Sequence, residues 1–286
     1  MQLFFARQWN NKLAGEVQAW LLVLAVSTVT GLAACSREAK LEQAIQAAAG
    51  TSGAAAVFID LDSDQHFFLN QKLAVVRHSP CSTFKIWNTL IGLQNGLIHS
   101  ASEPFYAWDG QERVIAAWNQ NLTLREAFQV SCVPAFQGLA RRIGTERMQS
   151  SLEAIKYGDG NLSAPIDSFW LPRPDQKSIQ ISVLEQAELL RDLLAGRLPF
   201  TQAAVAVLQQ VMFIKATMRG RLYGKTGSAA TVTKAGSMLF HGGWFTGYVI
   251  SGHRRIVFAL YIDRDGASGQ TARELLEKIL IQGGLL

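Results

Sequence analysis

The sequence predicts an α/β fold of the α+β type, with a central antiparallel sheet built from both chain ends and flanked by helices, plus a helical lobe. Short runs of β-branched and aromatic residues lie before residue 70 and after residue 220, whereas the segment between them has helical periodicity. The 286 residues are 49% hydrophobic and 17% charged, which is ample for a large core. Because the strands at both ends must share that core, they are expected to pair with each other.

The first strands form a predicted hairpin. Ala54–Leu61 and His66–Leu69 flank an Asp-Ser-Asp-Gln sequence, in which Asp and Ser favour a turn. After Pro80 an apolar run predicts a helix that ends near Asn95–Gly96, since glycine suits a left-handed C-cap. A further helix is predicted over residues 36–49, ahead of the hairpin.

The middle third is predicted to be helical, after an aromatic surface loop at 105–110. Thr123 is followed three residues later by Glu126, which is the pattern of a capping box and predicts a short helix over 123–130. Apolar residues at helical spacing predict four more helices, over 135–143, 145–155, 183–195 and 201–211.

From Gly220 onward the hydrophobic period changes to that of strands. Short β-branched and aromatic runs predict strands over 221–223, 244–251 and 256–262. The last element, over 272–281, is predicted to be a helix. The order of strands, helices, strands and helix therefore supports one sheet with strands from both ends of the chain.

Residues 1–34 are predicted to be a signal peptide. Arg7 and Lys12 precede an apolar stretch, and small residues follow it. The sequence Leu-Ala-Ala-Cys, ending at Cys35, resembles a bacterial lipobox, in which the cysteine is lipidated and becomes the new N-terminus. Ordinary cleavage after Ala33 is the alternative.

The expected layout is thus a signal peptide, a lead-in segment at 36–52 and a catalytic domain at 53–286. The expected location is the periplasm, with a lipid on Cys35 as a membrane tether. Ser36 after the cysteine resembles the sorting rule for the outer membrane of a two-membrane bacterium.

Charge and cysteine content exclude several classes of function. The net charge is +5 without a block of Lys or Arg, which argues against nucleic acid as a partner. The three cysteines are too few for a disulfide scaffold, and Cys81 and Cys132 have no zinc spacing. The five histidines form no ligand pair, so no metal is expected. We expect Cys81 and Cys132 to be buried thiols; a disulfide between them is the alternative.

Ser82 and Lys85 form an S-x-x-K pair at the start of the helix predicted after Pro80. A spacing of three places the hydroxyl and the amine on one helix face. The helix N-terminus offers backbone N–H groups to a developing oxyanion. Serine is a poor nucleophile until a base takes its proton, so Lys85 must be neutral or chemically altered.

Lys225, Thr226 and Gly227 provide a second motif in the strand region. They offer a cation, a hydroxyl and an open backbone N–H, and glycine lets a ligand approach closely. Neither motif is specific alone. Together with Ser131, which lies between two predicted helices, they resemble the penicillin-recognising serine acyl-enzyme family.

Within that family the chain resembles the class D (oxacillinase-type) β-lactamases. Ser131-Cys132-Val133 is similar to the Ser-x-Val motif of class D, and 118–124, 169–171 and 243–247 are similar as well. The resemblance implies a β-lactamase/transpeptidase-like fold. The chain departs from the pattern at Cys81, Cys132 and Trp87, and at Asp159, where class D commonly has Asn and where we expect a charge beside the cleft.

The resemblance also implies the catalytic roles. Ser82 would attack the lactam carbonyl, and Lys85, carboxylated by CO₂ to N6-carboxylysine, would act as general base. Ser131, assisted by Lys225, would relay a proton to the leaving nitrogen. No cofactor other than CO₂ or bicarbonate is implied.

The remaining predicted site residues bind substrate or enclose Lys85. Backbone N–H groups of Ser82 and Ser228 would form the oxyanion hole, next to Gly227. Thr226 and Arg273 would bind the substrate carboxylate. The apolar walls that lower the pKa of Lys85 would be Phe84, Val133, Trp170 and Leu171.

The predicted function is hydrolysis of penicillin-type β-lactams, which would confer resistance. One alternative is a β-lactam sensor that stays acylated, although sensors have a long membrane-embedded region upstream and here about 35 residues precede the domain. The other is a cell-wall transpeptidase, against which Val133 counts. The preferred β-lactam and the oligomeric state are left open.

Overall fold

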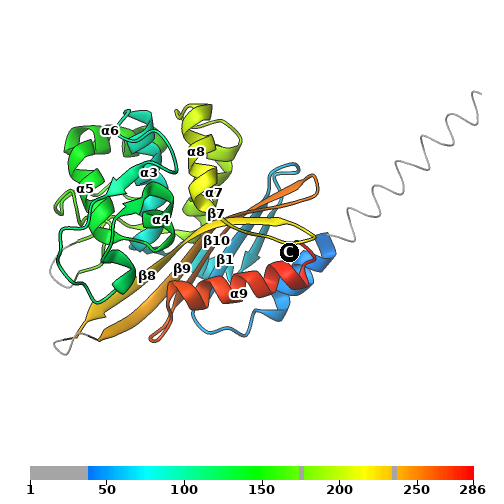
Figure 1. Ribbon diagram of the computed structural model, residues 1–286. Coiled ribbons are helices and arrows are strands. Elements are labelled where there is room, and N and C mark those ends of the chain that lie inside the picture. The colour runs from blue at the N-terminus through cyan, green and yellow to red at the C-terminus, as the bar shows by residue number, and fades with distance from the viewer. Residues whose placement is uncertain (1–37, 174–176, 234–236) are drawn as a thin grey trace, which may run out of the picture.

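The computed structural model describes residues 38–173, 177–233 and 237–286. Its centre is a six-stranded sheet in the order β2-β1-β10-β9-β8-β7, in which every pairing is antiparallel (Figure 1). The strands are β1 (Ala54–Asp60), β2 (His66–Leu69), β7 (Phe213–Ala216), β8 (Arg221–Val232), β9 (Met238–Ser251) and β10 (Arg254–Asp263). The predicted sheet, built from both chain ends, is confirmed.

The two faces of the sheet carry two different cores. Alternate residues of β1 divide between them: Val57 and Ile59 face the helical lobe, whereas Ala56 and Phe58 face the other layer. That other layer is the helix over 38–47 and α9 (Gly269–Gln282), which lie side by side in Figure 1. The sheet is therefore covered on both faces.

The helical lobe forms the other half of the molecule (Figure 1). Its helices are α3 (Lys85–Gln94), α4 (Leu124–Gln129), α5 (Val133–Ile143), α6 (Thr145–Ile155), α7 (Val183–Leu194) and α8 (Gln202–Met212). In α3 every residue from Lys85 to Gly92 is buried, so the helix after Ser82 is the centre of the lobe.

Local signals in the sequence set several boundaries correctly. The capping box of Thr123 and Glu126 is present at the start of α4. Gly96 has φ +63°, as the predicted left-handed C-cap of α3 requires. One boundary differs: Cys81–Phe84 is a 3₁₀ turn, η1, and the α-helix begins at Lys85.

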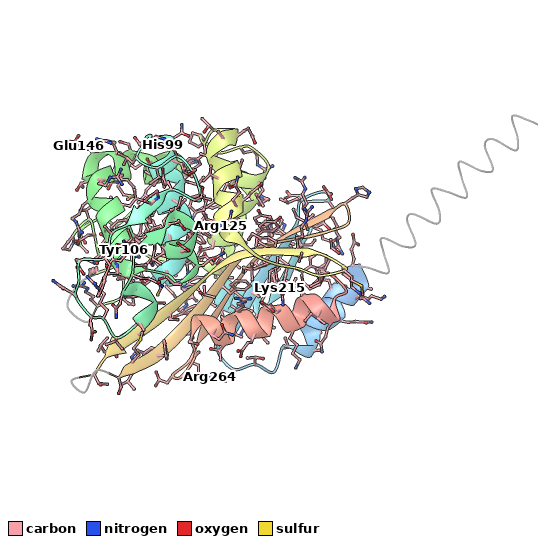
Figure 2. The ribbon with its side chains drawn as sticks, in the orientation of Figure 1. His99, Tyr106, Arg125, Glu146, Lys215 and Arg264 are labelled. Carbon is pink, nitrogen blue, oxygen red and sulfur yellow. The ribbon has the colours of Figure 1, made fainter. Side chains whose placement is uncertain are left out.

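The strands of the last third are longer than predicted. β8 continues to Val232 and β9 begins at Met238, because a long hairpin joins them. β7 was missed because it comes directly after α8. Shorter elements that were also missed are α2 (Gln71–Ala74), β3 (Arg77–His78), β4 (Pro104–Tyr106), β5 (Leu122–Thr123), β6 (Ile181–Ser182) and η2 (Ala116–Trp118). Tyr106, labelled in Figure 2, lies on β4, so the predicted loop at 105–110 begins as a strand.

The β8 strand has a free edge beside η1. β7 pairs only with Arg221–Tyr223, so within the described chain β8 is bonded from Gly224 onward to β9 alone. An unpaired strand edge offers backbone N–H and C=O groups to a ligand. The sheet thereby places part of the predicted Lys-Thr-Gly motif on an open edge.

Cys81 and Cys132 are both buried and both free, which confirms the expected pair of buried thiols. The predicted signal peptide and Cys35 lie outside the described residues. Among the residues that the structure describes, no helix is both long enough and apolar enough to span a bilayer.

Candidate active site

A cleft of about 600 Å³ lies between η1, the α4–α5 junction and β8. It brings together seven predicted site residues from four distant parts of the chain: Ser82, Ser131, Val133, Leu171, Thr226, Gly227 and Ser228. Lys85, Trp170 and Lys225 are buried beside it rather than in its lining, and Arg273 lines a neighbouring cavity.

Ser82 and Lys85 are in direct contact. Lys85 Nζ donates a hydrogen bond of 2.8 Å to Ser82 Oγ, and the Lys85 side chain is completely buried. The Nζ atom lies 5.4 Å from the centre of the Phe136 ring. Burial lowers the pKa of Lys85 to about 7, because removal from water disfavours the charged amine. The amine can therefore become neutral, and able to take the serine proton, near neutral pH.

Aromatic rings pack around Phe84, the residue before this lysine. Phe84 stacks on Trp170 at 5.6 Å between centroids and meets Phe169 and Tyr157 edge-on. Trp170 Nε1 is buried, and no residue that the structure describes accepts a hydrogen bond from it. A buried donor without an acceptor is costly, so this N–H is available to a group bound near Lys85.

The loop that precedes Ser82 is tied to the sheet and to this aromatic wall. Trp244 Nε1 of β9 donates to Ser79 O at 2.8 Å, and Ser79 Oγ donates to Trp170 O at 3.0 Å. Thr83 Oγ1 donates to Pro80 O at 2.6 Å, which closes the η1 turn. These bonds hold Ser82 in a fixed place relative to both halves of the molecule.

Ser131 lies in the turn between α4 and α5. Its φ is +57°, which is uncommon for a non-glycine residue, and Cys132 N donates to Ala127 O at 2.8 Å beside it. Ser131 Oγ is buried and has no hydrogen-bond partner in the part of the chain that the structure describes. The strained turn thus presents an unpaired hydroxyl in the cleft that contains Ser82.

Lys225 is the second buried amine. It is 3% exposed, and its Nζ donates to Thr226 O at 2.8 Å and lies 5.7 Å from the centre of the Phe128 ring. Burial, together with the charge of Lys85, lowers the pKa of Lys225 well below its usual value. The predicted pairing with Ser131 is not formed in this structure, since the amine bonds to the backbone instead.

Gly227 brings β8 against the nucleophile turn. A Cβ at this position would lie 3.1 Å from Pro80 O and 3.2 Å from the backbone nitrogens of Ser82 and Thr83. The side chain of the next residue, Ser228, bonds to α9 instead, because its Oγ accepts from Gly269 N at 2.9 Å. The Ser82 amide therefore lies against β8 just before Ser228, as an oxyanion hole made of these two residues requires.

Gly227→Val is expected to reduce the acylation rate by about a hundredfold, because displacing a reacting group by about 1 Å costs that much. The measurement is the acylation rate with a chromogenic cephalosporin. Gly138→Val in α5 is the matched control, since a Cβ there meets nothing within 4 Å. An unchanged rate in a folded Gly227→Val protein would contradict the close approach.

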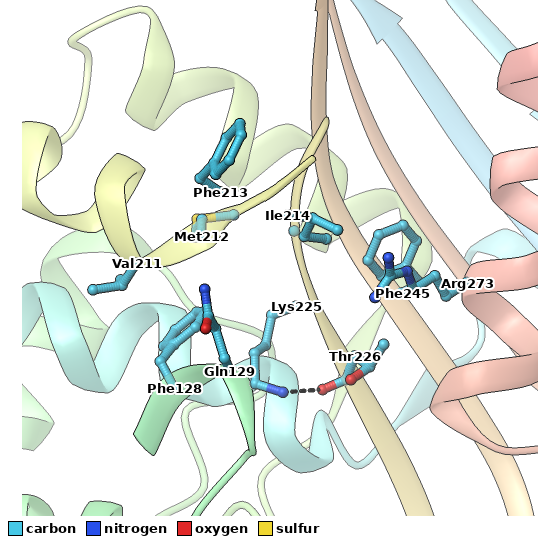
Figure 3. Close-up of a pocket in the computed structure, with 11 residues that line it drawn as sticks. Phe128, Gln129, Val211, Met212, Phe213, Ile214, Lys225, Thr226, Phe245 and Arg273 are labelled. Atoms are coloured by element: carbon cyan, nitrogen blue, oxygen red, sulfur yellow. Dashed lines mark hydrogen bonds between the residues drawn. The ribbon is translucent and has the colours of Figure 1, made fainter. Parts of the chain in front are cut away.

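Arg273 lies in an adjoining cavity of about 280 Å³ that shares Thr226 with the main cleft (Figure 3). Its Nε donates to Glu277 Oε1 at 2.6 Å, and Lys215 of β7, labelled in Figure 2, donates to the other oxygen of Glu277 at 2.5 Å. The predicted partners Thr226 and Arg273 thus both line the cavity that adjoins the cleft, and Arg273 is held there by an ion pair with Glu277.

Asp159 lines a cavity of about 440 Å³ that adjoins the Ser82 cleft and shares Pro172 and Arg173 with it. Its Oδ1 accepts from the backbone N–H groups of Asn161 and Gln180 at 3.1 and 3.0 Å. The side chain therefore lies beside the cleft, as expected, and it also holds two loops together. Trp87 is buried against Tyr157 and Phe200.

Sequence reasoning missed the apolar wall on the β8–β9 side of the cleft. Ala230–Val232, Met238 and Phe240 line it, opposite Ile115. Thr231 and Val232 are β-branched and could have extended the predicted strand. Phe136, which lies near Lys85, and Phe169 and Tyr157, which pack on Phe84, were also missed.

Comparison with known proteins agrees with this geometry. The family model for the penicillin binding protein transpeptidase domain matches residues 39–281. The probable β-lactamase YbxI of Bacillus subtilis is 37% identical over 227 residues, 79% of each chain. The crystal structure of a class D β-lactamase from Bacillus subtilis superposes with a TM-score of 0.73 at 36% identity, covering 82% of this chain and 92% of that one. The chain belongs to the class D β-lactamase family.

The chain is also similar to the domain of a penicillin receptor. The C-terminal domain of the Bacillus licheniformis BlaR penicillin-receptor superposes with a TM-score of 0.73 at 28% identity, covering 82% of this chain and 92% of that chain. Family membership therefore accounts for the fold and the cleft, whereas turnover depends on the chemistry at Ser82 and Lys85.

Proposed function

We propose that this class D β-lactamase hydrolyses penicillin-type β-lactams through an acyl-enzyme on Ser82 and releases the product, thereby conferring resistance. The observation that supports the proposal is the 2.8 Å contact between Lys85 Nζ and Ser82 Oγ in a water-excluded aromatic pocket. A nucleophile in contact with a base of lowered pKa is the arrangement that covalent catalysis requires.

In acylation, Ser82 Oγ attacks the lactam carbonyl carbon while its proton passes toward Lys85. The backbone N–H groups of Ser82 and Ser228 stabilise the oxyanion. Ser131 Oγ, which is unpaired, relays a proton with the assistance of Lys225: it gives its own proton to the leaving nitrogen and takes up the proton that Lys85 received from Ser82. Thr226 and Arg273 hold the substrate carboxylate, and the apolar wall at Met238 and Phe240 contacts the acyl side chain.

The residues around Lys85 fit a carbamate formed with CO₂. The pKa of about 7 leaves part of the amine neutral, and a neutral amine is the form that reacts with CO₂. Trp170 Nε1–H, buried without a partner, would donate to the carbamate, and Phe84 and Phe136 would keep water out. When formed, the carbamate supplies a negatively charged general base at neutral pH.

Receptor function is the second candidate, because the receptor domain shares the fold. An enzyme and a receptor differ in the fate of the acyl-enzyme, which water hydrolyses in the first and leaves intact in the second. Steady-state hydrolysis of a chromogenic cephalosporin tests this: an enzyme releases many product equivalents per Ser82, whereas a receptor stops after one. Release limited to one equivalent would favour the receptor.

We also propose export to the periplasm, with Cys35 as the lipid attachment site. Cys35→Ser is expected to move the protein from the membrane fraction to the soluble periplasmic fraction without changing its hydrolytic activity. The motivation is the Leu-Ala-Ala-Cys sequence. Immunoblotting of cell fractions measures the shift, and a distribution identical to that of the unchanged protein would contradict lipidation.

A further inference from the structure

A cavity of about 270 Å³ lies at the end of the sheet opposite the β8–β9 hairpin. Four elements meet there: the helix over 38–47, the β7–β8 turn, the β9–β10 turn and the end of α9. The residues that line the cavity include Lys40, Arg219, Ser251, Arg254 and Gly284. None of these residues takes part in the chemistry proposed for Ser82.

Arg254 is incompletely paired in this cavity. Its Nε donates to Asp60 Oδ2 at 2.6 Å, and the two side chains are only 13% and 6% exposed. Its Nη1 and Nη2 are buried and have no hydrogen-bond partner among the described residues. Unpaired donors on a buried guanidinium are costly, so a ligand with acceptor oxygens would be strongly favoured here.

Arg219 is held in place at the same cavity. Ser251 Oγ donates to Arg219 O at 2.8 Å, and Thr217 Oγ1 accepts from Arg219 N at 3.2 Å, so the turn that carries this residue is fixed. Arg219 Nη1 lies 3.7 Å from where a Cβ on Gly284 would be, which places the guanidinium over the end of α9.

The cavity has an excess of positive charge. Lys40, Arg219 and Arg254 carry three cations, against two carboxylates, that of Asp60 and the C-terminal carboxylate of Leu286, which follows Leu285 of the lining. In the described part of the chain neither Lys40 nor Arg219 forms an ion pair. The cations are therefore available to an external anion.

We propose that this cavity binds a phosphate group. Two phosphate oxygens accept from Nη1 and Nη2 of Arg254 as a fork, and Arg219 and Lys40 neutralise the remaining charge. A carboxylate has two oxygens and one charge, which would satisfy Arg254 alone. Phosphate offers a third oxygen and up to two negative charges for Arg219 and Lys40. Residue 38, the first described residue, lies at this end of the molecule (Figure 1). A lipid attached at Cys35, as proposed above, would bring this end close to a membrane, so the phosphate can come from a lipid headgroup as well as from solution.

Titration of the full chain with inorganic phosphate, followed by calorimetry, tests the site. Arg254→Lys keeps a charge beside Asp60 but loses the fork, and Arg219→Gln removes a second contact. Each is expected to weaken binding by about tenfold, whereas Arg255→Gln, an exposed neighbour paired with Asp62, should change it less than twofold. Unchanged hydrolysis of a chromogenic cephalosporin shows that the variants are folded.

Sedimentation with vesicles of phosphatidylglycerol distinguishes the two sources. If Arg219→Gln reduces vesicle binding and Arg255→Gln does not, the phosphate is a lipid headgroup; if only binding of inorganic phosphate falls, it is a soluble ion. Equal losses in Arg219→Gln and Arg255→Gln would indicate surface charge alone and would overturn the proposal. So would the lack of saturable phosphate binding below about 10 mM together with no variant-specific effect on vesicles.

Discussion

Ser82→Ala is expected to abolish covalent labelling by penicillin and to reduce hydrolysis by at least about three orders of magnitude, because no other hydroxyl contacts Lys85 Nζ in the described chain. Ser82 is only partly buried, in the η1 turn, so its hydroxyl contributes little to packing and the fold should be retained. Intact-protein mass spectrometry after incubation with penicillin measures the adduct.

The matched control is Ser102→Ala, which changes an exposed serine of the same lobe and should label like the unchanged protein. An adduct of the same mass on Ser82→Ala would show that another side chain is the nucleophile. The S-x-x-K assignment would then be wrong.

Lys85→Ala is expected to acylate slowly, if at all, and then to remain trapped as the acyl-enzyme, since the only base in contact with Ser82 in the described chain is lost. In the unchanged protein, hydrolysis should depend on pH and on CO₂. The pKa of Lys85 is lowered to about 7, so the amine is protonated as pH falls through that value. At pH 5 only roughly one amine in a hundred is neutral and able to react with CO₂.

Turnover at pH 5 in degassed buffer should therefore slow during the assay, and added bicarbonate should restore it. Above pH 7 the bicarbonate effect should disappear, because the amine is mostly neutral. Trp170→Ala should increase the bicarbonate requirement, since it admits water and removes a hydrogen-bond donor. Lys278→Ala, an exposed lysine of α9, is the control. Coincident progress curves with and without bicarbonate, and no carbamate signal in carbon-13 NMR, would refute carboxylation.

Much of the fold could be predicted from local signals. The capping box at Thr123 and the glycine at 96 set helix ends from a few residues each, without tertiary information. The length of β8 could not be predicted from local signals, because Gly224–Ala230 contains almost no β-branched or large residues. Pairing with β9 across the hairpin makes this segment a strand.

The catalytic residues were predicted from motifs, whereas the side chains that bury Lys85 were not all predicted. Spacing placed Ser82 and Lys85 on one face, and the structure adds the contact and the complete burial of Lys85. Phe136 comes from α5 and Tyr157 follows α6, so the approach of Phe136 to Lys85 and of Tyr157 to Phe84 depends on helix packing. The departure from the family pattern at Asp159 predicted a charge beside the cleft, and its side chain lies in the adjoining cavity; its bonds to the backbone of Asn161 and Gln180 could not be predicted.

The central claim is that the acyl-enzyme on Ser82 forms and is then hydrolysed. Time-resolved intact-protein mass spectrometry after one addition of excess penicillin tests it most directly. The proposed mechanism predicts that the unchanged protein gains the mass of one penicillin on Ser82 and returns to its free mass once the substrate is consumed, with hydrolysed penicillin in solution. An adduct that persists after the substrate is exhausted, with one product equivalent or none, would contradict turnover and identify a receptor.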